Sequence, residues 1–268
     1  MIVFPNAKIN IGLYITEKRN DGYHNIESCF YPIPWCDILE CLPASELQFT
    51  ATGLPIPNVS AHNLCLKAYE LLAADFALPP VHIHLHKILP IGAGLGGGSA
   101  DASFLLNALA EMFLLKASKE QLVGYAAKLG SDCAFFIANT PAFCYERGDR
   151  FEPLALSLQG KQIVLVYPNL HIATAEAYSA VQPAPAPVDL REVLLREPVR
   201  AWAGLVGNDF EKSLFPKYPF LADIKAALYE AGALYASMSG SGSTIYGIFE
   251  EVPRLVFPES YQVWQGVF

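Results

Sequence analysis

Apolar and polar residues alternate over several short stretches of the chain. Between Ala7 and Thr16 an isoleucine or leucine stands at every second position, and Val81–Lys87 alternates apolar residues with His82, His84 and His86. A period of two places successive side chains on opposite faces of a strand. Similar patterns predict further strands at 27–33, 37–42, 47–51, 142–146, 162–167, 234–238 and 244–249.

Helical patterns lie between these strands. In Asn63–Phe76 leucine and alanine recur at helical spacing, and Ser118 with Gln121 forms a capping-box pattern at the start of Ser118–Leu129. Further helices are predicted at 99–115, 174–181 and 219–231. The mixture indicates an α+β protein. A polar stretch at 156–161 predicts a boundary between two domains, residues 1–157 and 158–268.

The segment between the strand Val81–Lys87 and the next helix is rich in glycine. Glycine fills five of the seven positions from Gly92 to Gly98, and Ser99 is predicted to open the helix. Glycine lets the backbone adopt positive φ and approach a ligand closely. The unpaired N–H groups of a helix start also attract anions. A structural turn needs one or two glycines, so this loop predicts a phosphate site.

Three familiar phosphate loops do not fit this segment. Gly92, Gly94 and Gly97 match a dinucleotide-binding pattern, but the next segments are two helices, so no acidic residue follows at the end of a second strand. No Lys-Ser or Lys-Thr pair follows the glycines, which excludes a Walker A loop. The partner motifs of protein kinases are missing from the sequence as well.

Composition narrows the class of protein further. Apolar residues make up 53% of the 268 residues and charged ones only 16%, which is typical of a compact globular protein. A net charge of −8 disfavours nonspecific binding to nucleic acid or to anionic membranes. The six cysteines form no C-x-x-C pair, so we expect buried free thiols. The start of the chain has no signal-peptide pattern, and we expect a cytoplasmic protein.

Two charged residues are candidates for catalysis. Asp132 follows Gly130-Ser131 at a predicted helix start, where an aspartate is either a helix cap or a base beside apolar walls. Lys8 is a lone cation on an apolar strand, where a lysine is usually solvated or at a sheet edge. Asn10 shares the strand face of Lys8 and is placed to bind the same ligand.

Four segments together resemble the GHMP family of small-molecule kinases. They are Pro5–Asn10 with Asp21-Gly-Tyr-His24, the loop Pro90–Asp101, Gly130-Ser-Asp132, and Met238–Ser243 with its Ser-Gly-Ser-Gly-Ser string. The first segment is similar to the branch of the family that acts on a cytidine diphosphate derivative of methylerythritol. The resemblance covers nearly the whole chain.

The resemblance implies two α+β domains, an N-terminal ATP-binding domain and a C-terminal domain, with the active site in the cleft between them. It implies ATP with Mg²⁺ as phosphoryl donor, and Lys8 and Asp132 as the catalytic pair. It does not identify the residues that bind the metal ion. The residues implied for ATP are Pro90, Ile91, Gly92, Ala93, Gly94, Leu95, Gly96, Gly97, Gly98, Ser99, Ala100 and Asn63. Those implied for the substrate are Asn10, Tyr23, His24, Tyr178 and Gly240. Tyr23 and His24 are implied to recognise the cytosine, and Tyr178 to sandwich the base from the other side.

Several alternatives stay open at this point. The chain could be another member of the family that acts on mevalonate, homoserine or a sugar, but such an enzyme has no need of the Tyr23–His24 string. A nucleotide-binding sensor would need the glycine loop but neither Lys8 nor Asp132. Asn63 is equally interpretable as a helix cap, and the Ser-Gly-Ser-Gly-Ser string as a plain turn. His82, His84 and His86 are predicted to be a polar sheet face because they are spread over about 13 Å of strand. We expect a monomer or a weak homodimer.

Overall fold

The computed structural model describes residues 1–56 and 63–268, which form two compact units. The first unit comprises Met1–Ala7, Trp35–Ile91 and Gly96–Asn139. The second comprises Lys8–Pro34, Gly92–Leu95 and Thr140–Phe268. The glycine loop is therefore divided between the units. The domain boundary at 157/158 stays a prediction.

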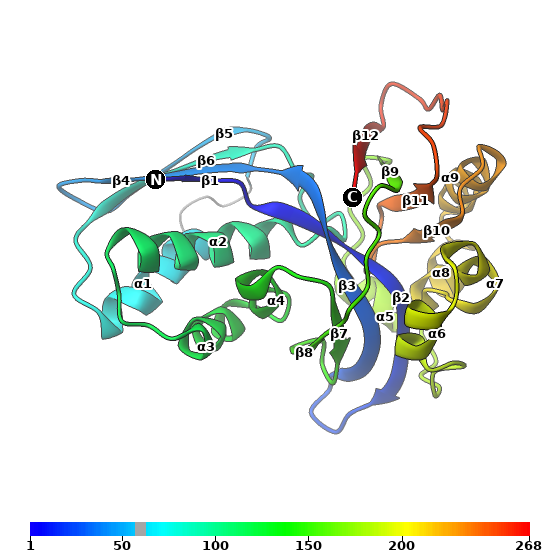
Figure 1. Ribbon diagram of the computed structural model, residues 1–268, viewed down its shortest axis with the longest axis horizontal. Helices are drawn as coiled ribbons and strands as arrows, with labels where there is room; N and C mark the ends of the chain where they lie inside the picture. Colours follow the sequence, from blue (N-terminus) through cyan, green and yellow to red (C-terminus); the bar gives the residue numbers. More distant parts are fainter. Residues whose placement is uncertain (57–62) are drawn as a thin grey trace. The chain divides into compact units, whose positions relative to one another are not determined.

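The first unit is a four-stranded sheet with helices on one face (Figure 1). Its strands run in the order β1 (Ile2–Val3), β4 (Ile38–Pro43), β6 (Val81–Lys87) and β5 (Gln48–Gly53). Its helices are α1 (Leu64–Asp75), α2 (Gly97–Met112), α3 (Lys119–Leu129) and α4 (Cys133–Ala138). The inward residues of β6, such as Ile83, are fully buried against leucines of α1 and α2. Burial of this apolar layer holds the helices on the sheet.

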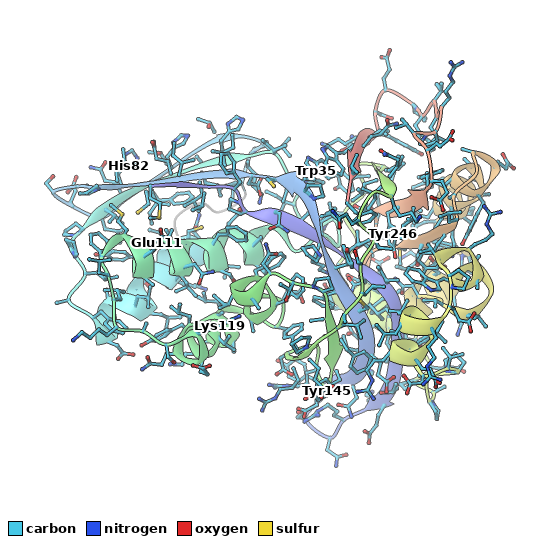
Figure 2. The ribbon with its side chains drawn as sticks, viewed as in Figure 1. Trp35, His82, Glu111, Lys119, Tyr145 and Tyr246 are labelled. Atoms are coloured by element: carbon cyan, nitrogen blue, oxygen red, sulfur yellow. The ribbon has the colours of Figure 1, made fainter. Side chains whose placement is uncertain are left out.

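The outer face of the same sheet carries the three histidines of β6. Figure 2 shows His82 on the side of the sheet away from the helices. Thr50 of β5 bonds the rings of His82 and His84, each at 2.8 Å, and Thr52 bonds those of His84 and His86. The prediction of a polar sheet face is confirmed.

The second unit contains a sheet in the order β10 (Tyr235–Met238), β11 (Ile245–Phe249), β9 (Gln162–Tyr167) and β12 (Gln262–Val267). Each neighbouring pair is antiparallel. Helix α9 (Pro219–Glu230) packs against β10 and β11 (Figure 1). The shorter helical segments are α5 (Thr174–Ser179), α6 (Leu190–Arg196), η1 (Val199–Ala201), α7 (Trp202–Leu205) and α8 (Asp209–Leu214).

A third sheet has the order β2 (Asn6–Lys18), β3 (His24–Cys36), β7 (Ala142–Tyr145) and β8 (Arg150–Pro153). The free edge of β2 is covered by loops of the second unit. Lys8 N donates to Leu95 O and Leu13 N to Gly207 O, both at 2.9 Å. Ile15 N donates to Asp209 Oδ2 at 2.9 Å. Gly12 has a φ of +69° between these contacts, and a side chain there would meet Leu190 at 2.7 Å.

Most predicted elements are present, with some corrections. Helix α2 begins at Gly97, not Ser99, because Gly96 in the left-handed region serves as its N-cap. The predictions missed short elements with weak periodicity, namely β1, β8, β12, α6, α7 and α8. Five of the six cysteines are buried, and all six are free thiols, as expected. In the described part of the chain, no helix is long and apolar enough to span a membrane.

Candidate active site

The start of α2 presents an open backbone surface. Gly92, Gly94 and Gly96 have φ values of +66°, +81° and +71°, which side chains rarely adopt. Gly98, in the first turn, is exposed, and a Cβ there would meet only Leu64 Cδ1, at 4.0 Å. The helix start thus offers N–H groups to an incoming anion with room around them. Pro90 lies just before this surface and is buried, whereas Ile91 is exposed.

Asp132 lies next to this helix start within the first unit. The side chain of Ser99, in the first turn of α2, lies beside the Cys133 thiol. One turn further along α2, Ser103 Oγ donates to Cys133 O at 2.7 Å. Burial raises the pKa of Cys133 to about 11, so this thiol stays protonated at neutral pH. These contacts hold Asp132, the residue before Cys133, close to the start of α2.

The two helix-cap alternatives have different outcomes. Asn63 is the N-cap of α1, and its Oδ1 accepts from Cys65 N at 2.8 Å and from Leu66 N at 3.4 Å. Asp132 is half-buried at the N-cap position of α4, but its side chain makes no capping bond to a described residue. The helix-cap interpretation of Asp132 is therefore not borne out by its side chain, whereas that of Asn63 is.

A buried ion cluster underlies the start of α2. Lys87 Nζ lies 2.6 Å from Asp37 Oδ2 and 2.7 Å from Asp101 Oδ2, and none of the three side chains is more than 4% exposed. Asp37 Oδ1 also accepts from Ile88 N and Leu89 N. A Cβ on Gly97 would stand 3.1 Å from Lys87 Nζ. Burial raises the pKa of Asp101 to about 7, although Lys87 opposes the shift.

In the second unit, Lys8 and Asn10 lie together, as the strand period predicts. Both are buried, so Lys8 is not a solvated edge lysine. Lys8 Nζ donates to Asn10 Oδ1 at 2.5 Å and lies 4.6 Å from the centre of the Phe30 ring. Asn10 Nδ2 donates to Ser28 Oγ at 2.9 Å. These contacts fix both side chains on one strand face.

The second glycine string packs against both β2 and the first glycine loop. Ser239 Oγ donates to Gly94 O at 2.8 Å and accepts from Asn10 N at 3.3 Å. A Cβ on Gly240 would be 3.3 Å from Asn10 Oδ1. The hydroxyl of Tyr246, labelled in Figure 2, donates to Asn10 O at 2.8 Å. This string is more than a plain turn, because it braces Asn10 and Gly94.

Two residues predicted to bind the base form a stack. The rings of His24 and Tyr178 are 4.8 Å apart at 22°. Phe210 meets Tyr178 edge-on at 4.9 Å. The two rings contact each other directly, and their binding of a base stays a prediction. Tyr23 directly precedes His24 in the sequence and is 59% exposed. The Arg147 guanidinium lies 5.3 Å from the centre of its ring.

The structure does not bring all predicted residues into one described unit. Asp132 and the start of α2 belong to the first unit, whereas Lys8, Asn10, His24, Tyr178 and Gly240 belong to the second. The pairing of Lys8 with Asp132 therefore stays a prediction. Across residues 1–56 and 63–268, no group of three or more His, Cys, Asp or Glu is arranged to hold a metal ion.

Sequence reasoning missed the segment Asn208-Asp-Phe-Glu211 at the start of α8. Asn208 Nδ2 donates to Met238 O at 2.8 Å and to Gly240 O at 2.9 Å, next to the second glycine string. Glu211 Oε1 accepts from Met238 N at 2.8 Å. An asparagine followed by two acids within one turn is a helix-start signal, and it could have revealed this six-residue helix.

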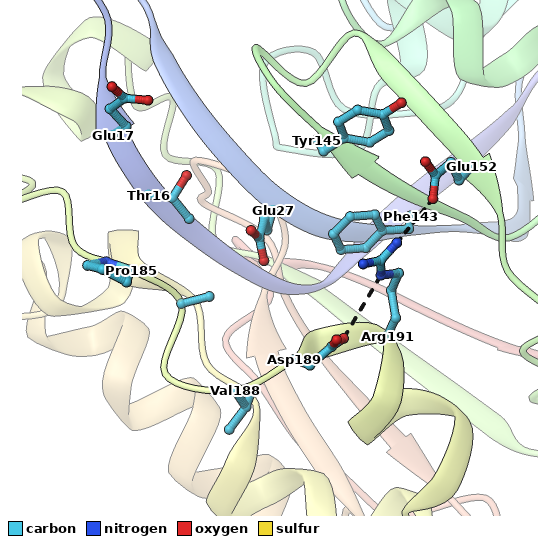
Figure 3. Close-up of a pocket in the computed structure, with 11 residues that line it drawn as sticks. Thr16, Glu17, Glu27, Phe143, Tyr145, Glu152, Pro185, Val188, Asp189 and Arg191 are labelled. Atoms are coloured by element: carbon cyan, nitrogen blue, oxygen red, sulfur yellow. Dashed lines mark hydrogen bonds and ion pairs between the residues drawn. The ribbon is translucent and has the colours of Figure 1, made fainter.

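A cavity of about 780 Å³ lies elsewhere in the second unit (Figure 3). Glu27 and Phe143 line it, whereas the paired neighbours Ser28 and Cys144 face the other side of the sheet, on the side of Asn10. Four acidic residues face a single arginine, which is bonded to Glu152 at 3.1 Å. The excess of negative charge disfavours the binding of a polyphosphate in this cavity. The acidic residues are Glu17, Glu27, Glu152 and Asp189.

Two family models match the chain. The model for the GHMP kinases N terminal domain matches residues 63–147, and the model for the GHMP kinases C terminal domain matches residues 190–256. The first range contains the glycine loop and Asp132, and the second contains Asn208 and Gly240.

Relatives of this chain share about half of its residues over almost its whole length. A protein of Cytophaga hutchinsonii is 52% identical and covers 95% of this chain and 94% of its own. One of Bacteroides fragilis strain YCH46 is 51% identical and covers 97% of both. Both relatives are called 4-diphosphocytidyl-2-C-methyl-D-erythritol kinase.

Solved structures agree with these matches. A crystal structure of a 4-(cytidine 5'-diphospho)-2C-methyl-D-erythritol kinase superposes with a TM-score of 0.78 at 32% identity, covering 92% of this chain and 90% of the other. The Methanococcus jannaschii mevalonate kinase has a TM-score of 0.70 at 13% identity, over 99% and 97% of the two chains, which shows a shared fold. The chain belongs to the GHMP kinase family.

Proposed function

We propose that the protein transfers the γ-phosphoryl group of ATP to the 2-hydroxyl of 4-diphosphocytidyl-2-C-methyl-D-erythritol. This is a step of the non-mevalonate route to isoprenoid precursors. The observation that carries the proposal is the 52% identity, over 95% of the chain, to a relative called a kinase for this substrate. GHMP kinases use ATP as donor, and the open start of α2 supports a phosphate site.

The residues have distinct roles in this proposal. Phosphoryl transfer requires positioning of the donor, neutralisation of charge and a group that takes the hydroxyl proton. The backbone of Gly96–Ser99 holds the phosphates of the Mg²⁺–ATP substrate, and the Ser99 hydroxyl contacts a phosphate or the metal ion. Asp132 accepts the proton while Lys8 keeps its carboxylate ionised and orients the alcohol. The place of Asp132, one residue before Cys133 and so beside the start of α2, supports its role.

The second unit supplies recognition of the alcohol. The stacked rings of His24 and Tyr178 offer an aromatic face to the cytosine, a contact worth about 1–3 kcal/mol for a base. Burial, with a smaller effect of Lys18, lowers the pKa of His24, so its ring is neutral at pH 7 and suits stacking and hydrogen bonding. Asn10 is placed by Lys8 and Ser28 to contact the substrate.

The test is ADP release by the purified protein with Mg²⁺–ATP and the cytidyl substrate, with mevalonate, homoserine and galactose in parallel. We expect turnover with the cytidyl substrate alone. Turnover with another of these alcohols would overturn the substrate assignment, and ATP binding without any turnover would favour a sensor.

The catalytic pair is tested separately by Asp132→Asn and Lys8→Ala. Each should lower kcat by about 10²–10⁴-fold, the usual contribution of general-base catalysis. Circular dichroism controls for folding. A folded variant that keeps more than a tenth of the activity removes that residue from the mechanism.

A further inference from the structure

The Asn208 side chain makes three hydrogen bonds in two directions. Its Nδ2 donates to Met238 O and Gly240 O at 2.8 and 2.9 Å. Its Oδ1 accepts from Phe210 N at 2.9 Å and so caps α8. The residue is 4% exposed, so these bonds do not compete with water.

The first direction leads to the phosphate loop. Met238 and Gly240 flank Ser239, whose hydroxyl donates to Gly94 O at 2.8 Å. A Cβ on Gly94 would stand 2.0 Å from Ser239 O, so the two loops are in backbone contact. Any shift of Gly240 therefore moves the loop that carries Gly94.

The second direction leads to the aromatic stack. The cap at Asn208 fixes the first turn of α8, which carries Phe210. Phe210 is 2% exposed and meets Tyr178 edge-on at 4.9 Å, and Tyr178 stacks on His24. The position of the stack thus depends on where α8 begins.

We propose that Asn208 is a positioning residue that sets the glycine string 239–243 against the phosphate loop and sets Phe210 behind the His24–Tyr178 stack. Its amide aligns the phosphoryl donor, and its carbonyl, through α8, aligns the base of the alcohol. The inference rests on the proposed function only for the identity of that alcohol.

The two directions are separable by substitution. Asn208→Asp keeps an oxygen to cap α8 but replaces the two donated bonds by repulsion between a carboxylate and two carbonyls. Asn208→Ser also keeps a capping oxygen and is too short to bond both carbonyls. We expect kcat to fall about tenfold to a hundredfold in both variants, since small misplacements of reacting groups cost this much. The KM for the cytidyl substrate should stay within about twofold, since the cap and the edge-on ring are kept.

Phe210→Leu disturbs the other direction. It removes the ring edge that supports Tyr178 and leaves Asn208 intact. The KM for the cytidyl substrate should rise about fivefold, as the loss of an edge-on aromatic pair implies, with kcat and the KM for ATP little changed. Asn107→Asp is the matched control, because Asn107 Nδ2 also donates to a backbone carbonyl, Ile137 O, at 3.4 Å.

Steady-state kinetics of these proteins decide the proposal, with melting temperatures measured on the same samples. The proposal holds if the Asn208 variants change kcat and Phe210→Leu changes KM. It is overturned if folded Asn208 variants keep the wild-type kcat, or if Asn107→Asp lowers kcat as much as they do. It is also overturned if the Asn208 variants and Phe210→Leu change kcat and KM in the same way. If the wild-type protein phosphorylates a different alcohol, the proposed substrate is wrong, and the kcat effect at Asn208 is then measured with that alcohol.

Discussion

The two glycine-rich segments of this protein have similar sequences and opposite environments. The start of α2 is open at Gly98, where an added Cβ would find its nearest neighbour at 4.0 Å. In the string 239–243, Ser239, Gly240, Gly242 and Ser243 are all buried, and a Cβ on Gly242 would stand 2.7 Å from Met238 Sδ. The first segment has room around its backbone at Gly98, whereas the second is packed among its neighbours. Glycine content alone does not distinguish these two environments, whereas the space around each Cβ position does.

The strongest test of this contrast is Gly94→Ala, at the contact between the two segments. A Cβ would lie 2.0 Å from Ser239 O, a backbone atom that cannot rotate away, and φ is +81°. We expect loss of activity by more than about a hundredfold, because the loop must shift from its reacting geometry. ADP release measures the effect, and wild-type activity in a folded variant would show that the contact is not needed.

The next test concerns the ion cluster beneath α2. The Asp101 carboxyl has a pKa of about 7 in the folded protein and about 3.9 when unfolded. The folded state therefore binds more protons between these values, and the free energy of unfolding falls as the pH rises from 4 to 7. The melting temperature of the wild-type protein should decline from pH 5 to pH 8, and that of Asp101→Asn should decline less.

The groups that face Asp101 in this test are Lys87, Asp37 and Cys65. Asp101 Oδ1 is buried without a hydrogen-bond partner in the described structure, so its charged form is poorly solvated. Equal pH slopes in the two proteins would show that Asp101 does not titrate in this range.

A smaller effect is expected for Gly98→Ala, at the open segment. The fold has room for the methyl group, so the melting temperature should not fall. The methyl group does narrow the approach to the N–H groups of the helix start. We expect the KM for ATP to rise about tenfold while the KM for the alcohol is unchanged, which is a loss of donor binding alone. An unchanged KM for ATP would place the phosphates elsewhere.

The smallest effect on the protein is expected for Gly124→Ala, because Gly124 lies outside both glycine-rich segments. Gly124 is exposed inside α3, and no atom lies within 4 Å of its Cβ position. Alanine should stabilise the protein by about 0.5–1 kcal/mol with no change in activity, because glycine costs backbone entropy in a helix. Urea unfolding measures this, and destabilisation would mean that this glycine has a role in the fold.

Local patterns in the sequence predicted the elements that local forces determine. Strand β6 has the predicted bounds because its alternation is strict. Helix α3 begins with the predicted capping box, in which Ser118 Oγ accepts from Gln121 N at 3.2 Å. The predicted start of α2 was wrong by two residues, because two glycines in the first turn contradict helix propensity and the N-cap at Gly96 gives no side-chain signal.

The candidate site follows the same division. The shared strand face of Lys8 and Asn10 is predictable from the strand period and is confirmed by the hydrogen bond between their side chains. The contacts of Asn208 could not be predicted, because they join its side chain to backbone carbonyls about thirty residues away, and no local pattern relates the two segments. The stack of His24 on Tyr178 depends in the same way on how β3 and α5 meet in the fold.

The loops that cover the edge of β2 have a further consequence. Strand β2 is thirteen residues long and lies at the end of its sheet, where unpaired N–H and C=O groups offer a template to other chains. Leu13 N, Ile15 N and Ile15 O are instead bonded to Gly207, Asp209 and Ala184. Damage to this covering would expose a ready pairing surface, so substitutions there would reduce the yield of native protein through self-association before they altered its chemistry.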